Sequence, residues 1–261
     1  MVDIQDIAHS LIQAEKTKNP ILPITSSTES ISVDEAYQIQ LEIVKHKLNA
    51  GRRIVGKKIG LTSKAMQELL GVNEPDYGHL FDDMAFSNDA VIDVHPFIQP
   101  RIEFEIAFVL KKDIFGPGIT EEDVTAATDY IVPAIEIIDS RIKDWQIQFE
   151  DTVADNGSAA GFILGEKRTN IEFVDPEKIT LAVYHNGQLV DEATGAAVMG
   201  NPLRAVAWLA NALARYEIPL KAGEVILSGA LTKAIDVQAG DTFTASFSIG
   251  EVSARFKGGE G

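Results

Sequence analysis

The chain has 261 residues, 45% of them hydrophobic and 24% charged, which indicates a globular protein with a buried core rather than a disordered chain. Asp and Glu total 39 against 23 Lys and Arg, and the net charge of −16 argues against nucleic acid as a partner. Cysteine is absent, so disulfides, thiolate metal ligands and a cysteine nucleophile are excluded.

The N-terminal segment does not have the pattern of a signal peptide. Asp3 and Asp6 stand where a signal peptide needs a basic start and an unbroken apolar run. No apolar stretch of the sequence reaches the roughly 18 residues that a membrane span requires. We therefore expect a cytoplasmic protein without a membrane partner.

Two amphipathic helices are predicted at the start of the chain. Residues 3–17 carry apolar side chains at helical spacing. A second helix is expected to begin at Ser32, because Glu35 three residues later completes a capping box, and to stop near Gly51. These helices predict an N-terminal layer.

The rest of the chain, residues 53–261, is predicted to form a catalytic β-roll domain on which the helical region 1–52 packs, although the two can count as one domain. Branched and aromatic runs predict strands at 54–59, 90–94, 102–110, 130–138, 179–185, 225–228 and 242–249, with a tight turn at Asn186-Gly187. Helices are expected near 63–70, 120–128 and 202–216, and the tail 258–261 is expected to fray. Since the strands do not alternate strictly with helices, the predicted fold class is α+β, with a mixed, curved sheet or β-roll.

The predicted strand 102–110 carries two acidic residues on one face. Strand side chains alternate between faces, so Glu103 and Glu105 share a face while the opposite face is fully apolar. Two neighbouring carboxylates repel each other, and a cation between them would remove that cost. The alternative is a half-buried strand whose first residues face water.

Glu136 is a single acid embedded in a run of isoleucine and valine. A buried carboxylate without a partner is costly, so it needs a cation or a proton. The partner could be Arg101 or Arg141, or it could be the same metal that Glu103 and Glu105 suggest. Three carboxylates with waters or substrate oxygens suit Mg²⁺ or Mn²⁺, and the lack of cysteine argues against zinc.

Three further segments carry polar groups whose role the sequence alone does not decide. In the glycine-flanked run 51–62, either Lys57 or Lys58 could hold an anionic substrate or move a proton, or both could be solvated. Taken alone, residues 73–79 predict a plain turn. Residues 151–158 predict a polar loop, and composition alone does not separate site residues from turn residues there.

Several of these motifs resemble one known family. They lie at 56–62, 74–78, 101–105, 134–141, 153–156, 195–202 and 227–231. In this order they resemble the 2-keto-4-pentenoate hydratase branch of the fumarylacetoacetate hydrolase superfamily, over about residues 31–256. The resemblance implies a β-roll of that type, a homo-oligomer and a Mg²⁺ or Mn²⁺ ion on Glu103, Glu105 and Glu136. It also implies that Lys58 and Asp76 carry protons.

The resemblance implies a hydro-lyase that adds water to 2-hydroxypenta-2,4-dienoate, or a close homologue, to give a 4-hydroxy-2-oxo acid. The substrate is expected to chelate the metal through its carboxylate and 2-oxygen. Such a reaction belongs to the meta-cleavage catabolism of aromatic compounds, and an association with other enzymes of that pathway is a further expectation. The residues expected to line the substrate pocket are Leu61, Asn156, Ser158 and Ser228.

Three other functions are alternatives to the hydratase. The same branch contains 4-oxalocrotonate decarboxylases, which tend to carry an apolar residue at the position of Asp76, and residues 141–149 also look hydratase-like. Acylpyruvate hydrolases typically use a His-Glu pair near the N-terminus, but His46 and His79 have no obvious glutamate partner. The third alternative is a non-catalytic protein whose carboxylates hold a structural cation.

Overall fold

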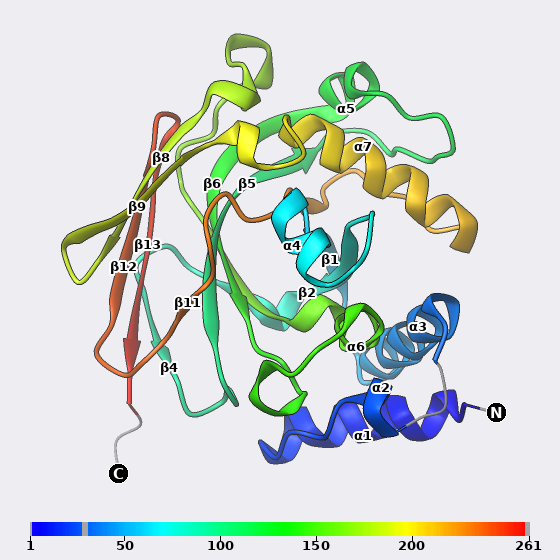
Figure 1. Ribbon diagram of the computed structural model, residues 1–261. Helices are drawn as coiled ribbons and strands as arrows, with labels where there is room; N and C mark the ends of the chain where they lie inside the picture. Colours follow the sequence, from blue (N-terminus) through cyan, green and yellow to red (C-terminus); the bar gives the residue numbers. More distant parts are fainter. Residues whose placement is uncertain (1, 28–30, 259–261) are drawn as a thin grey trace.

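Two curved sheets and a set of helices build the computed structural model, which describes residues 2–27 and 31–258 (Figure 1). The larger sheet runs β2-β1-β10-β5-β6-β7-β3, with β11 paired to β5, and the smaller runs β4-β13-β12-β8-β9. The strands of the larger sheet are β1 (Ile54–Gly60), β2 (Asp76–Phe81), β3 (Ala85–Phe86), β5 (Arg101–Leu110), β6 (Thr128–Ile138), β7 (Ala159–Leu164), β10 (Val225–Leu227) and β11 (Ile235–Asp236). Those of the smaller are β4 (Ala90–Asp93), β8 (Thr180–His185), β9 (Gln188–Thr194), β12 (Thr242–Phe247) and β13 (Gly250–Lys257).

The sheets mix parallel and antiparallel pairs, and the predicted α+β class is confirmed. Strand β1 lies parallel to β10 and antiparallel to β2, while β5 and β6 form a long antiparallel pair. The apolar face of β5 is buried from Ile102 to Leu110, as its alternating pattern predicts. The predicted turn at Asn186 and Gly187, both with positive φ, joins β8 to β9.

Helices cover one end and one side of the sheets (Figure 1). They are α1 (Ile4–Thr17), α2 (Ile24–Ser27), α3 (Val33–Asn49), α4 (Lys64–Leu69), α5 (Glu121–Ala127), α6 (Phe149–Ala154) and α7 (Pro202–Leu213). The capping box of Ser32 and Glu35 is present at the start of α3. Helix α3 packs between α1 and α6 and also contacts β2 directly, through the stacked rings of Tyr37 and Tyr77. The division at residue 52 stays a prediction.

Two predicted segments have a different structure. Residues 73–79 do not form a plain turn, because β2 begins at Asp76 and all six of its residues are buried. Residues 151–158 are not a loop, because α6 extends to Ala154 before a tight turn. In both places polar residues suggested exposure, whereas tertiary contacts bury them. No strand was predicted at β3, β7, β9, β11 or β13 either, although the predicted turn at Asn186 and Gly187 implied a strand after it.

No helix in the described ranges is long and apolar enough to span a membrane. Of the tail predicted to fray, residues 259–261 lie outside the described ranges.

Candidate active site

Three glutamates meet on the β5–β6 pair. Glu103 lies directly opposite Glu136 in the register of the two strands, and Glu105 lies two residues further along β5. One carboxylate oxygen from each lies within 4.8 Å of the others. Glu105 and Glu136 are fully buried and Glu103 is partly buried. The structure therefore brings together the three side chains that the sequence suggests as metal ligands.

The carboxylates of this cluster lack enough hydrogen-bond donors. Glu105 Oε2 accepts a 2.6 Å hydrogen bond from the backbone N–H of Gly229, but Glu105 Oε1 has no partner in the described ranges. Neither oxygen of Glu136 has a hydrogen bond there, and its nearest cation is Lys58, with Nζ 3.4 Å from Oε1. Buried carboxylate oxygens without donors are costly, so this donor set fits a hard divalent cation.

The two arginines considered as partners of Glu136 are paired elsewhere. Arg101 forms an ion pair with Asp236 at 2.8 Å, and Arg141 forms one with Asp155 at 2.5 Å. The interpretation of Glu136 as the partner of an arginine is therefore wrong.

Burial and mutual repulsion make the glutamates poor acids. Burial, followed by the charge of Glu103, raises the pKa of Glu105 to about 7. Burial also raises the pKa of Glu136 well above its ordinary value, although Lys58 opposes the change. Burial is also the main cause of the raised pKa of Glu103. A divalent cation would favour the ionised form of all three carboxyls.

Lys58 is the lysine of β1 that faces the glutamates. Its Nζ donates a 3.0 Å hydrogen bond to the carbonyl oxygen of Gly157 and lies near Glu136. Burial lowers the pKa of Lys58, but the charges of Glu136 and its neighbours exceed this effect, and the net pKa is raised. Lys57 points to the other face, where its Nζ pairs with Glu224 at 2.6 Å.

Asp76 opens β2 beside Lys58. Its Oδ2 accepts a 3.0 Å hydrogen bond from Thr152 Oγ1, and its Oδ1 has no partner in the described ranges. Asp76 lies opposite Gly60 in the register of β1 and β2. A Cβ placed on Gly60 would lie 2.0 Å from Asp76 Oδ1 and 3.3 Å from Lys58 Nζ. Both groups therefore crowd the same side of Gly60, which has room for no side chain.

The four predicted pocket residues have different surroundings. Ser228 is buried after β10, next to the Gly229 donor, and its Oγ has no partner in the described ranges. Ser158 Oγ donates to Asp155 Oδ2 at 3.1 Å. The side chain of Asn156 holds the backbone N–H and C=O of His79, at 2.8 and 2.9 Å. Leu61 follows β1 with a φ of 55° and is partly buried.

The turn that holds Lys58 is left-handed over three residues. Asn156, Gly157 and Ser158 have φ values of 56°, 58° and 55°. Two of the three carry side chains, so the conformation is strained and needs support from its surroundings. The ion pair of Arg141 with Asp155 and the contact of Asn156 with His79 supply that support.

Several residues of this arrangement were given no role from the sequence, although all of them except Gln40 lie within segments that the sequence analysis singled out. They are Gln40, Gly60, Thr152, Asp155, Gly157 and Gly229. Most act through backbone atoms or hold another residue, and such roles have no local sequence pattern. The hydrogen bond from Gly229 to Glu105, for example, joins residues 124 positions apart.

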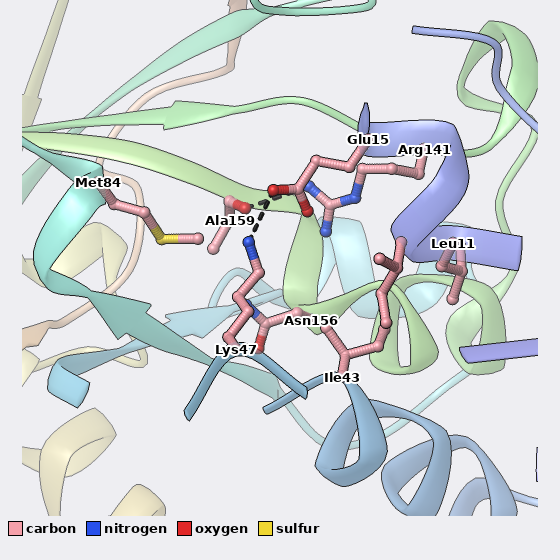
Figure 2. Close-up of a pocket in the computed structure, with 9 residues that line it drawn as sticks. Leu11, Glu15, Ile43, Lys47, Met84, Arg141, Asn156 and Ala159 are labelled. Carbon is pink, nitrogen blue, oxygen red and sulfur yellow. Dashed lines mark hydrogen bonds and ion pairs between the residues drawn. The ribbon is translucent and has the colours of Figure 1, made fainter. Parts of the chain in front are cut away.

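Two hollows of the surface lie away from the glutamates. Figure 2 shows the first, where Lys47 of α3 pairs with Glu15 of α1 at 2.6 Å beside Arg141. The second is an open groove along α7, lined among others by Met199 and Trp208. Neither is lined by the three glutamates. The polar groups and their geometry therefore define the site.

Comparison with known proteins gives consistent matches. The model of the family "Fumarylacetoacetate (FAA) hydrolase C-terminal" matches residues 60–257. The chain is 44% identical to 2-hydroxyhexa-2,4-dienoate hydratase of Comamonas testosteroni, covering 92% of each chain. It is 42% identical to 2-keto-4-pentenoate hydratase of Paraburkholderia xenovorans, over 97% of this chain and 94% of the relative. A solved 4-oxalocrotonate decarboxylase from Pseudomonas putida G7, complexed with magnesium and adipate, superposes with a TM-score of 0.94 at 38% identity, covering 97% of each chain.

Proposed function

This chain belongs to the fumarylacetoacetate hydrolase family, and we propose that Glu103, Glu105 and Glu136 hold the divalent cation of a hydratase in which Lys58 and Asp76 handle protons. The enzyme is a hydro-lyase of aromatic catabolism, like its hydratase relatives. It adds water to 2-hydroxypenta-2,4-dienoate or a close homologue and forms a 4-hydroxy-2-oxo acid. The observation that carries the assignment of residues is the convergence of three carboxylates beside Lys58 and Asp76, two of them fully buried with oxygens that have no hydrogen-bond donor in the described ranges.

The ligand set favours Mg²⁺ or Mn²⁺ as the cation. Carboxylate oxygens without nitrogen or sulfur ligands suit hard ions of this kind. When bound, such an ion supplies Lewis acidity toward the carboxylate and 2-oxygen of the substrate. The superposed decarboxylase structure is complexed with magnesium and with adipate, a dicarboxylate, which supports a divalent cation and an anionic ligand for this fold.

Lys58 and Asp76 have complementary properties for proton transfer. Lys58 carries an ammonium group beside the glutamates, and a cation that offset the glutamate charges would remove the main cause of its raised pKa and so help it to donate a proton toward a carbon of the dienoate. Asp76 has one oxygen fixed by Thr152 and the other free, so the free Oδ1 can orient or deprotonate the water that adds at C4. Ser228 has a free buried hydroxyl and can bind a substrate oxygen.

The other predicted pocket residues form the walls. Asn156 and Ser158 belong to the left-handed turn that presents a carbonyl to Lys58, so their contribution is to shape the pocket. Leu61 follows β1 and offers an apolar side chain near the dienoate.

A decarboxylase is the second candidate, because the superposed 4-oxalocrotonate decarboxylase has nearly the same fold. Decarboxylation requires an electron sink, which a cation supplies, but no group that activates water. Asp76, held by Thr152 with one oxygen free, is the group that favours hydration. Incubation with 2-oxohex-3-enedioate and detection of CO₂ separates the two activities.

An ultraviolet assay of dienoate loss tests the proposed function. We expect turnover with Mg²⁺ or Mn²⁺ on substrates that end in hydrogen or methyl, and none in EDTA. The Asp76→Val variant should lose hydration and still bind Mn²⁺. Full activity in EDTA, or full activity of the variant, would refute the proposed roles. The homo-oligomeric state, the cytoplasmic location and an association with other pathway enzymes stay predictions.

A further inference from the structure

Strand β2, which carries Asp76, lies at the edge of the larger sheet. Its outer side has no neighbouring strand within residues 2–27 and 31–258, and an unpaired edge leaves backbone donors and acceptors without partners. Side-chain amides take the place of a strand here. Asn156 binds both backbone groups of His79, and Gln40 binds the carbonyl oxygen of Tyr77. These two amides therefore hold the outer side of β2, while its inner side pairs with β1.

Gln40 projects from α3 and is completely buried. Its Nε2 donates to the carbonyl oxygens of Tyr77 at 2.9 Å and Val153 at 2.8 Å. Its Oε1 lies 3.1 Å from His79 Nδ1. Burial, followed by the charge of Lys57, lowers the pKa of His79 to about 3, so the ring is neutral and its Nδ1–H donates to Oε1. These three contacts fix which way the amide faces.

The two carbonyls that Gln40 binds belong to the neighbours of two site residues. Tyr77 directly follows Asp76, and Val153 directly follows Thr152. Thr152 Oγ1 in turn donates the 3.0 Å hydrogen bond to Asp76 Oδ2. A single amide group therefore ties together the two backbone segments whose side chains make this bond.

We propose that Gln40 is a positioning residue for hydration, because it fixes β2 against α6 and so directs the free Oδ1 of Asp76. This inference rests on the proposed role of Asp76 in activating water. It makes α3, which precedes the residues that the family model matches, a working part of the active site. A group displaced by about 1 Å can cost about a hundredfold in rate, so the amide need not touch the substrate to matter.

Kinetics of two variants test the proposal. Gln40→Met, which keeps the length of the side chain but not its donors, should lower kcat by about 10- to 100-fold, with KM and Mn²⁺ affinity within about twofold of the parent enzyme. Thr152→Val should have a similar effect, and Thr152→Ser should restore most of the activity. If Gln40 acts through Thr152, the double variant should be little worse than either single variant, because the effects of coupled residues are not additive.

Two variants of the same helix are the controls. Gln38→Leu lies on the exposed side of α3 and should leave kcat unchanged. Ile43→Ala, at a buried position, should lower thermal stability without lowering the kcat of the folded enzyme. The proposal is overturned if Gln40→Met behaves like Ile43→Ala, or if the effects of Gln40→Met and Thr152→Val simply multiply.

The Asp76→Asn variant separates this inference from the proposed function. If Asp76→Asn is inactive and Gln40→Met keeps full kcat, only the role of Gln40 fails. If Asp76→Asn keeps full activity, the role of Asp76 fails and that of Gln40 fails with it. Should Gln40→Met not fold, Gln40→Glu and the Thr152 variants give the same comparison, because a carboxyl at position 40 has at most one donor for the two carbonyls.

Discussion

Glu103 and Glu136 face each other directly across the antiparallel pair of β5 and β6. Opposed like charges destabilise a strand pair, and here the second carboxylate is completely buried. The ammonium group of Lys58, with Nζ 3.4 Å from Glu136 Oε1, offsets both charges in part, and Arg101 also favours the ionised form of Glu103. The centre of the larger sheet is therefore a place where a cation or added protons should control stability as well as activity.

Stability in the presence of a chelator should fall as the pH rises. The pKa of Glu105 is raised from 4.5 to about 7 in the folded protein, so between these values the folded state binds more protons than the unfolded state. The free-energy cost of ionising the buried Glu105 is therefore absent below about pH 4.5. It grows as the pH rises to 7 and is complete above that pH. Melting temperatures measured in EDTA from pH 5 to pH 8 should show this decline.

Mg²⁺ or Mn²⁺ should restore the thermal stability that the protein loses at high pH. A cation at about one hundred times its Kd stabilises by about 2.7 kcal/mol, which corresponds to about 5–10 °C in Tm. At pH 5 protons compete for the carboxylates, so the gain should be smaller there. Equal melting temperatures with and without the cation at pH 8 would contradict a metal site at these glutamates.

Replacing one glutamate should separate stability from activity. Glu105→Gln removes a buried charge that has one unpartnered oxygen, so in EDTA the variant should be at least as stable as the parent protein. Its Mn²⁺ affinity should fall and its turnover should drop about a thousandfold, since cation catalysis contributes several kcal/mol. Calorimetric Mn²⁺ titration and thermal melts measure the two effects.

Glu224→Gln is the matched control for that variant. Glu224 is also buried, but it is paired with Lys57 and accepts the backbone N–H of Lys221. Breaking a buried ion pair costs about 3–5 kcal/mol, so this variant should be destabilised while its Mn²⁺ affinity is kept. The opposite pattern in the two variants would show that Glu105 does not bind the cation.

A single methyl group added at position 60 should displace the carboxylate of Asp76 and so lower activity. Gly60 is not among the residues with positive φ, so alanine is tolerated by the backbone there. Its Cβ would lie 2.0 Å from Asp76 Oδ1, and the carboxylate must move away. We expect Gly60→Ala to lower kcat by at least about tenfold with unchanged Mn²⁺ affinity. Gly258→Ala, whose Cβ would lie 3.5 Å from its nearest neighbour, should have no effect in the same assay.

The sequence predicted which face of a strand a side chain lies on better than it predicted which distant residues that side chain contacts. Glu103 and Glu105 share a face because strand side chains alternate, which is a local rule. The register that sets Glu136 opposite Glu103 depends on the whole sheet, and the sequence left an arginine partner open. Asp76 lies in a segment whose Asn, Pro, Asp and Gly predict a turn, yet the amides of Gln40 and Asn156 make that segment a buried edge strand.

The ion pair of Arg141 and Asp155 should contribute far more to the free energy of unfolding than an exposed ion pair does. Both side chains are buried, and the guanidinium group also donates to the carbonyl oxygens of Asp139 and Ala159. Arg141→Ala leaves Asp155 buried without its partner and should cost about 3–5 kcal/mol in urea unfolding. Arg52→Ala, which breaks a half-exposed pair, should cost less than about 1 kcal/mol.

Arg141→Ala should also lower the activity of the molecules that remain folded. Asp155 begins the left-handed turn whose Gly157 carbonyl accepts the hydrogen bond of Lys58 Nζ. Without Arg141 the strained turn can relax and withdraw that carbonyl, so Lys58 loses the contact that directs it. Measured at a temperature where the variant is fully folded, kcat should fall by about tenfold or more while Mn²⁺ affinity changes little. An unchanged kcat would mean that the glutamates alone hold Lys58 in place.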